Sequence, residues 1–541
     1  MSYILRLSLL LNFLQRTLQV STANSPYYTA AVVEYFPVQE IGLSPKDKTL
    51  KNVNNYLSLL NEVTEDIDIV VFPEATITTG FQNRNRTILL ALATIIPDPS
   101  KNIVVCHQTS ENYSQYLISL SCGAKNRAVY LVANVIEKRI CTGNKCASDN
   151  WDFYNSNVIF DRNGTVVGRY RKYNLFGEYT LNKTSKAELS PFTTDFNVTF
   201  GQFICFDLLF DTPANALLRN GIRDFVFPTM WFSELPFLTA LQAQEQWAYE
   251  NDVNFLAAGA NNPAVGSGGS AIVEGSRGAI IEDIIAQGDS KIYVANVTKR
   301  TPRSLLTSVE TKITTEEIDK VALTLDNFFL LKDNLTDYAF QLINTTTTTS
   351  IDKSLCHGSG ENILCCQFRV NLTVNSVTNG AQNSYNYAFL AFSGVRTFSG
   401  TYNGGIETCA VVACTNNTPA TCGVRFSNYS TVSWPITFQS ITIKGNFSNV
   451  LHKIQYPNSL RSNLRPLPTT NFKWSYENIS QINSKKRTLA LIEPENRLIT
   501  FAIFGRDYSR DSDPRFSSSS HYSIIALVYC LFITLCVLLF K

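Results

Sequence analysis

Residues 201–207 read Gly-Gln-Phe-Ile-Cys-Phe-Asp, a short apolar run that carries a cysteine and stops at an acid. The run predicts a buried strand over residues 200–206. A cysteine near the end of such a strand lies at the carboxyl edge of a sheet, where open α/β sheets place their chemistry. A cysteine alone is more often a packed core residue or half of a disulfide. Cys205 therefore indicates function only in the company of other residues.

The segments around this run alternate between strand and helix patterns. An Asn-Gly turn at residues 163–164 lies between two alternating runs and predicts a hairpin over residues 155–170. The alternation as a whole predicts an α/β layered domain over residues 24–310. Strand patterns occupy residues 29–35, 67–72, 101–106, 128–137, 224–228 and 254–259, and helical spacing occupies residues 51–65, 213–220 and 239–251.

The pattern changes after about residue 310. Residues 311–350 include a threonine run and are expected to form a linker. Short β-branched and aromatic runs separated by turn residues follow, and they predict a smaller, mostly β domain over residues 351–507. That region carries no acid, base and nucleophile set of its own, so we place the chemistry in the first domain.

The first residues of the chain have the pattern of a secretory signal peptide. Arg6 precedes a mostly apolar run at residues 7–14, and small residues precede the expected cleavage point after Ala23. We expect residues 1–23 to be removed and the mature chain to be exported.

The other end of the chain resembles a lipid-attachment signal. Residues 508–541 combine a polar stem, a serine cluster, an apolar run at 524–540 and a terminal lysine. This order is typical of a GPI-attachment signal, with Ser517 or Ser512 as the attachment residue. A single-span protein without a cytoplasmic tail is the alternative. We expect an extracellular protein held on the outer leaflet of the cell membrane by a lipid anchor, with a secreted form as the alternative.

Asn-x-Ser/Thr sequons occur in both halves of the chain, as expected of a secreted glycoprotein. The candidate glycosylation residues are Asn85, Asn112, Asn163, Asn182, Asn197, Asn296, Asn334, Asn344, Asn371, Asn416, Asn428, Asn446 and Asn478.

The number of cysteines also fits a secreted protein. Of 13 cysteines, Cys530 and Cys536 lie in the predicted tail signal, which leaves an odd number in an oxidising environment. If Cys205 is the free thiol, the others can pair within their own halves, in a connectivity that spacing does not reveal. The cysteines lack paired metal spacing with histidine, so we expect no metal and no other cofactor. A net charge of +2 and the lack of a basic run argue against a nucleic-acid partner.

Two further residues follow predicted strands. Glu74 follows the apolar run 67–72, and a carboxylate there can act as a general base, although its ordinary role would be a helix N-cap. Lys172 follows the hairpin, where its ordinary role would be in a solvated basic patch. Together with Cys205 they form a candidate catalytic set, each member just past a strand.

Glutamate, lysine and cysteine in this order resemble the catalytic pattern of the nitrilase (carbon–nitrogen hydrolase) superfamily, and the flanking sequence is similar to its vanin/biotinidase branch. The resemblance covers most of the mature chain and implies a nitrilase-like αββα sandwich followed by the β-rich domain. Its motifs are FPEATI (72–77), LVANVI (131–136), NSNVIFDRNGTVVGRYRKYNLFGE (155–178), FGQFICFDLLFDTPA (200–214) and FPTMWFSELP (227–236).

The resemblance implies amide hydrolysis through a covalent thioester. Glu74 is implied as the general base, Cys205 as the nucleophile, and Lys172 with the backbone N–H of Phe206 as the stabilisers of the oxyanion. Lys172 is also implied as a proton donor. Glu178 resembles the second glutamate of the family, which positions the lysine and the substrate amide. A lysine beside the thiol is also expected to lower the thiol pKa.

The substrate is a small amide under this interpretation. By analogy with vanins it is pantetheine, cleaved to pantothenate and cysteamine, and by analogy with biotinidase it is biocytin. The anchor signal favours the vanin side. A catalytically silent surface glycoprotein on the same scaffold is a further alternative, but it predicts the loss of a catalytic residue, and Glu74, Lys172 and Cys205 are all present. A papain-like protease would need a histidine base, and none of the four histidines has a suitable context.

Overall fold

The structure is a computed structural model that describes residues 20–80, 85–143, 146–300, 314–344, 349–375, 382–479 and 483–513. Most of the predicted signal peptide, Ser517 and the apolar tail lie outside the described residues. Among the residues that the structure describes, no helix is both long and apolar enough to span a bilayer.

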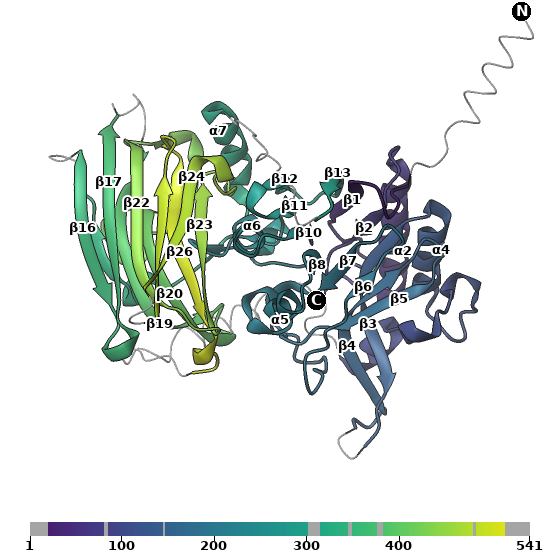
Figure 1. Ribbon diagram of the computed structural model, residues 1–541. Helices are drawn as coiled ribbons and strands as arrows, with labels where there is room; N and C mark the ends of the chain where they lie inside the picture. Colours follow the sequence, from purple (N-terminus) through teal and green to yellow (C-terminus); the bar gives the residue numbers. More distant parts are fainter. Residues whose placement is uncertain are drawn as a thin grey trace, which may run out of the picture.

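The first half of the chain forms two six-stranded sheets packed face to face (Figure 1). Apolar residues of both sheets interdigitate between them, including Val32, Ile69, Val226 and Leu256. The first sheet has the order β13 (Lys291–Thr298), β1 (Tyr27–Glu34), β2 (Ile69–Val71), β3 (Tyr130–Ile140), β4 (Trp151–Phe160) and β5 (Val166–Arg171). The second has the order β12 (Ala279–Asp283), β11 (Ser270–Glu274), β10 (Asn254–Gly259), β8 (Asp224–Thr229), β7 (Thr199–Gln202) and β6 (Phe192–Thr193).

Helices cover the outer faces of these sheets. On the first sheet, α2 (Pro45–Glu62) and α4 (Gln115–Arg127) bury apolar side chains against the strands. On the second sheet, α6 (Ala240–Asn251) buries Trp247 in an aromatic cluster with Phe203. Short helices α3 (Arg86–Leu92) and α5 (Ala216–Arg219) complete the layers. The predicted αββα sandwich is therefore confirmed.

The second half is mostly β, as predicted, and consists of two five-stranded antiparallel sheets. One sheet has the order β15 (Ala339–Leu342), β19 (Asn386–Phe398), β20 (Tyr402–Cys414), β26 (Leu498–Asp507) and β23 (Lys453–Arg461). The other has the order β16 (Ser350–His357), β17 (Leu364–Val374), β22 (Ile436–Ser448), β25 (Ser484–Leu491) and β24 (Phe472–Ile479).

The two halves share one continuous apolar core that runs from Phe203 through Trp247 to Phe504. The β-rich domain packs on the α6 side of the sandwich (Figure 1). At this contact Gln242 of α6 donates from Nε2 to Oδ1 of Asn458 at 2.7 Å, deep in the protein. The β-rich domain therefore packs against α6, the helix that covers the outer face of the second sheet.

Several local predictions were wrong. Residues 101–106 form no strand but lie among the 3-10 turns Pro99–Lys101 and Val105–His107, because Asp98 caps the first turn and the Cys106–Cys122 disulfide ties the second to α4. The expected linker 311–350 contains α7 (Thr315–Thr324), β15, and β14 (Leu331–Lys332), which pairs with β9 (Glu234–Leu235) of the first domain.

Cys205 is the only free cysteine among the described residues. The other described cysteines form the disulfides Cys106–Cys122, Cys141–Cys146, Cys356–Cys365, Cys366–Cys409 and Cys414–Cys422. Each bridge stays within its own half of the chain, as the cysteine count predicted.

The sequon asparagines lie at the surface with one exception. Asn182 is half-buried, and its Oδ1 accepts the backbone N–H of Phe153 at 2.8 Å. Ser512, the described candidate for lipid attachment, is exposed and donates to the Tyr402 hydroxyl at 2.9 Å. Glycosylation and lipid attachment at these residues stay predictions.

Candidate active site

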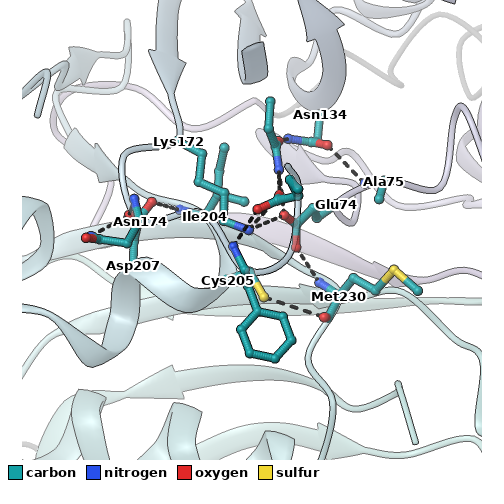
Figure 2. Close-up of polar contacts among 12 residues, drawn as sticks. Glu74, Ala75, Asn134, Lys172, Asn174, Ile204, Cys205, Asp207 and Met230 are labelled. Atoms are coloured by element: carbon teal, nitrogen blue, oxygen red, sulfur yellow. Dashed lines mark hydrogen bonds and ion pairs between the residues drawn. The ribbon is translucent and has the colours of Figure 1, made fainter. Parts of the chain in front are cut away.

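The predicted catalytic residues converge at the ends of three strands. Glu74 follows β2, Lys172 follows β5, and Cys205 follows β7 of the opposite sheet. All three side chains lie together in Figure 2 and are buried, as is Glu178. The structure thus brings all four predicted side chains into one site, and Lys172 is not part of a solvated basic patch.

Lys172 lies between the two glutamates. Its Nζ is 2.8 Å from Oε1 of Glu74 and 2.9 Å from Oε1 of Glu178. Burial alone would lower the pKa of Lys172, but the attraction of Glu178 and Glu74 outweighs it and raises this pKa well above its usual value. The lysine is therefore a fixed cation and is not a proton acceptor at neutral pH.

Asn155, in β4, is a site residue that the sequence interpretation missed. Its Nδ2 donates to Oε1 of Glu74 at 2.7 Å and to Oε1 of Glu178 at 2.6 Å. Lys172 and Asn155 therefore bridge the same two oxygen atoms from different directions. Like charges at this separation repel, and the two bridges let both carboxylates share one small site.

A second asparagine fixes the orientation of the Asn155 side-chain amide. Asn134, in β3, donates from Nδ2 to Oδ1 of Asn155 at 2.7 Å, and its own Oδ1 accepts the backbone N–H of Ala75 at 2.9 Å (Figure 2). The one available signal in the sequence was the presence of buried-strand asparagines in otherwise apolar runs, at residues 131–136 and 155–160.

Cys205 does not end a strand as predicted. β7 stops at Gln202, and Cys205 begins a 3-10 turn with a φ of 48°. This left-handed conformation is strained for a residue with a side chain, at a cost of about 1–3 kcal/mol. It is held because Asp207 Oδ2 accepts the backbone N–H of Ile204 at 3.1 Å. The turn presents the thiol at the start of a short helix.

Asp207 also connects the cysteine turn to the lysine segment. Its carboxylate accepts the Tyr170 hydroxyl at 2.7 Å and the backbone N–H of Asn174 at 2.8 Å, on either side of Lys172. Burial raises the pKa of Asp207 to about 6. One buried carboxylate thus sets the relative positions of the nucleophile and the cation.

The backbone of Met230 connects Cys205 with Glu74. Its N–H donates to Oε2 of Glu74 at 2.9 Å, and its carbonyl oxygen lies 3.5 Å from the Cys205 Sγ and accepts the thiol proton (Figure 2). The Cys205 thiol and the Glu74 carboxylate therefore each form a hydrogen bond with the backbone of the same residue.

The thiol pKa is not lowered as predicted. Burial raises the pKa of Cys205 well above its usual value, the negative charge of Glu74 raises it further, and Lys172 opposes only part of this effect. Burial likewise raises the pKa of Glu178, against the attraction of Lys172. In the resting site the cysteine is a thiol, so a nucleophilic role for it would require a base that removes its proton.

A cavity of about 320 Å³ opens in front of these groups, which is the size of a small-molecule site. Glu74, Lys172, Glu178 and Cys205 line it, and Phe176, Phe232 and Val265 provide apolar walls. A nucleophile, a carboxylate and a fixed cation around one cavity suit the attack of sulfur on a carbonyl carbon.

The comparisons with known proteins agree with this geometry. Residues 29–301 match the family model "Carbon-nitrogen hydrolase", and residues 328–511 match "Vanin C-terminal domain". "Vanin-like protein 1" of Drosophila melanogaster is 34% identical over 513 residues, which cover 91% of this chain and 88% of the relative. Human "Pantetheinase" is 28% identical over 505 residues, 90% of each chain.

A solved structure from Saccharomyces cerevisiae, a member of branch 10 of the nitrilase superfamily, is similar with a TM-score of 0.39 and 20% identity, covering 52% of this chain and 93% of that one. Two family models together span most of the described chain, and the relatives match nearly all of it. The chain therefore belongs to the vanin branch of the carbon–nitrogen hydrolase (nitrilase) superfamily and is a hydrolase of amide bonds.

Proposed function

We propose that this protein hydrolyses pantetheine to pantothenate and cysteamine through a thioester on Cys205. The observation that carries the proposal is the Met230 backbone, which holds the thiol and the Glu74 carboxylate together beside the Lys172 ammonium. Relatives that cover nine tenths of the chain are named pantetheinase, which favours this amide over others.

In the first half-reaction, Glu74 takes the thiol proton of Cys205 as sulfur attacks the amide carbonyl carbon. Lys172 and the backbone N–H of Phe206 stabilise the tetrahedral oxyanion, an effect worth about 10²- to 10³-fold in rate per donor. The carbon–nitrogen bond then breaks, and the amine leaves with the proton that Glu74 received from the thiol.

In the second half-reaction, water replaces the amine. Glu74 takes a proton from the water as the water oxygen attacks the thioester carbonyl carbon. The carbon–sulfur bond then breaks, the sulfur takes that proton back from Glu74, and the acid leaves. Glu178 and Asn155 keep Lys172 and Glu74 in place in both steps.

A substrate panel on the purified ectodomain tests this proposal. Pantetheine, biocytin and simple aliphatic amides are compared at equal concentration, with Cys205→Ala as the control. We expect the highest kcat/KM for pantetheine and none in the control. Preferred hydrolysis of biocytin would replace the substrate, and no hydrolysis of any amide would favour a silent glycoprotein. Intact-mass detection of an acyl group on Cys205 tests the thioester.

We also propose that residues 24–310 act as the catalytic domain and residues 351–507 as a supporting domain of an extracellular enzyme with a GPI anchor. Phosphatidylinositol-specific phospholipase C on intact cells should release the activity into the medium. Activity that stays on the membrane, together with recovery of a peptide containing Cys530 from the mature protein, would indicate a single-span protein instead.

A further inference from the structure

The segment that carries Met230 joins β8 to α6, and we call residues 230–238 the bridging loop. At the start of this loop the Met230 backbone contacts both Glu74 and Cys205. Two residues later, Phe232 lines the same cavity as Glu74 and Cys205. The start of the bridging loop therefore belongs to the candidate active site, and contacts made elsewhere on the loop can affect that site.

Hydrogen bonds within the bridging loop connect its middle to its start. Glu234 and Leu238 exchange backbone hydrogen bonds at 3.1 and 2.9 Å, which close the loop into a turn. The indole N–H of Trp231 donates to the Leu238 carbonyl at 2.9 Å, and Trp231 directly follows Met230. Through this chain of contacts a displacement of Glu234 reaches the peptide groups of Met230.

A buried arginine of the β-rich domain holds the middle of the bridging loop. Arg396, in β19, pairs with Glu234 and, at 3.2 Å, with Asp333, which directly follows β14. These three side chains are at most 8% exposed. The backbone N–H of Asp333 also donates to the Leu235 carbonyl at 2.8 Å. Arg396 therefore binds two segments that are themselves joined at the loop.

Neutral groups of the β-rich domain also contact the bridging loop. The Thr500 hydroxyl donates to the Pro236 carbonyl at 2.9 Å, and Nδ2 of Asn458 donates to the Phe237 carbonyl at 2.9 Å. Arg396 differs from these residues because it neutralises a carboxylate of the loop. A buried carboxylate that loses its cation must move toward water or take up a proton, so the loop depends on Arg396 most strongly.

We propose that Arg396 of the β-rich domain is a positioning residue for amide hydrolysis. It holds Glu234, and Glu234 holds the bridging loop. The loop in turn keeps the Met230 backbone in contact with Glu74 and Cys205. This inference rests on the roles proposed above for Glu74 and Cys205, and it gives the β-rich domain a specific contact through which it supports catalysis.

Arg396→Met tests the proposal, because it removes the cation and keeps an unbranched apolar side chain. Glu234 and Asp333 are then buried without their partner, and the bridging loop should shift. We expect kcat for pantetheine, per folded molecule, to fall by about 10- to 10²-fold, up to the scale of misplacing a catalytic group. Arg396→Lys returns the charge but not the guanidinium geometry, so it should recover part of this loss and not all of it.

Lys453→Met is the matched control, because Lys453 is also a buried cation that pairs with two acids. Its Nζ lies 2.7 Å from Oε1 of Glu407 and 3.2 Å from Oδ2 of Asp507, and its side chain is 8% exposed. All three residues belong to the β-rich domain, and in the described chain no hydrogen bond or ion pair joins them to the bridging loop. Both variants should lose thermal stability, but only Arg396→Met should lose kcat at a temperature where both are folded.

A second readout follows the contact at Met230 and needs no substrate. The Cys205 thiol donates to the Met230 carbonyl, and this hydrogen bond favours the protonated form of the thiol. If the bridging loop shifts, the bond is lost, and iodoacetamide should alkylate Cys205 faster at neutral pH. We expect this increase in Arg396→Met and not in Lys453→Met, as measured by mass spectrometry of the Cys205 peptide.

Wild-type kcat in Arg396→Met, equal losses of kcat in Arg396→Met and Lys453→Met, or an unchanged alkylation rate in Arg396→Met overturns the proposal. If Arg396→Met is not secreted in folded form, Arg396→Lys is compared with Lys453→Arg. A loss of kcat confined to Arg396→Lys then supports the positioning role, and equal values overturn it.

If the wild type hydrolyses no amide, the proposed function fails, and the alkylation rates decide on the link between the domains. Faster alkylation in Arg396→Met than in Lys453→Met supports the link through the bridging loop. Equal rates in the two variants overturn it.

Discussion

Asn155 Nδ2 lies 2.7 Å from Oε1 of Glu74, and this contact joins the proposed base, which follows β2, to β4, two strands away in the same sheet. The same nitrogen contacts Glu178 at 2.6 Å. The Asn155 amide thus donates to two carboxylates at once, a pair of contacts that it shares with Lys172. Asn155 is therefore a positioning residue, and its contribution can be separated from that of the groups it holds.

Asn155→Asp keeps the shape of the side chain but replaces the donor by a third carboxylate. We expect kcat at neutral pH to fall by about 10²-fold, the scale of misplacing a catalytic group, with partial recovery at lower pH as one carboxyl gains a proton. The check is the pH profile of kcat. Asn157→Asp is the matched control, because Asn157 is buried in the same strand and accepts from Asn134 at 3.3 Å. Equal profiles in the two variants would contradict the positioning role.

The protonated state of Cys205 predicts how the free enzyme reacts with alkylating agents. Because burial and Glu74 raise the thiol pKa, the alkylation rate with iodoacetamide should keep rising above neutral pH and should reach no plateau near pH 7. Stopped-time mass spectrometry of the Cys205 peptide measures this rate. A plateau at or below about pH 7 would mean that the thiolate is already formed in the resting site.

Glu74→Gln separates the two effects of this carboxylate on the thiol. Loss of the negative charge of Glu74 leaves Glu178 as the remaining carboxylate paired with Lys172, so the thiol pKa should fall and alkylation at neutral pH should become faster. Amide hydrolysis should nevertheless fall by about 10²- to 10⁴-fold, the range for loss of a general base. Alkylation and hydrolysis are measured on one preparation. Substantial hydrolysis by this variant would rule out Glu74 as the base.

Lys172→Ala should lower kcat by about 10²-fold or more, since an oxyanion donor is lost. It also leaves Glu74 and Glu178 buried without their shared cation, so we expect a lower melting temperature as well. Lys172→Arg is the companion variant: it keeps the charge but not the compact ammonium, and it should recover stability more than kcat. Full kcat in Lys172→Ala would exclude the oxyanion role.

Glu34 predicts a pH dependence of stability outside the site. Burial raises its pKa from 4.5 to about 7, although Ile285 and Gly269 donate backbone N–H groups to its carboxylate. The folded state therefore holds the proton more tightly than the unfolded chain does. Stability is greatest below about pH 4.5 for this group and falls as pH rises to about 7, by up to about 3 kcal/mol.

Glu34→Gln removes this titration. The melting temperature of the wild type should fall more between about pH 5 and pH 8 than that of the variant, whatever the overall stability of the variant. Asp207 and Asp224, whose pKa values burial raises to about 6, remain in both proteins and so cancel in the comparison. Parallel curves for the two proteins would show that Glu34 does not titrate in this range.

The parts of the fold that the sequence predicted well are those with long or strongly bounded apolar runs. Strands 224–228 and 254–259 appear as β8 and β10 with nearly the expected ends, because both faces are buried. The run 101–106 was misread because a disulfide and a cap, and no neighbouring strand, determine its conformation.

That these candidate side chains lie in one site could be predicted because each carries an uncommon charge or thiol just past a strand end. Asn155 could not, because a polar residue in a hairpin strand ordinarily faces solvent, and only the packed structure shows that this one faces inward. The sign of the Cys205 pKa shift also depends on burial, which sequence spacing to Lys172 does not contain.

The contact between thiol and carboxylate runs through the peptide groups of Met230, not through its side chain. Replacement of Met230 by any amino acid other than proline keeps both the N–H and the carbonyl. A side-chain substitution at this position therefore leaves the link in place, and an alanine scan would not reveal it. Only chemistry on the main chain, such as an ester in place of the amide that carries this N–H, removes the donor to Glu74, and Met230 then contacts the Cys205 thiol alone.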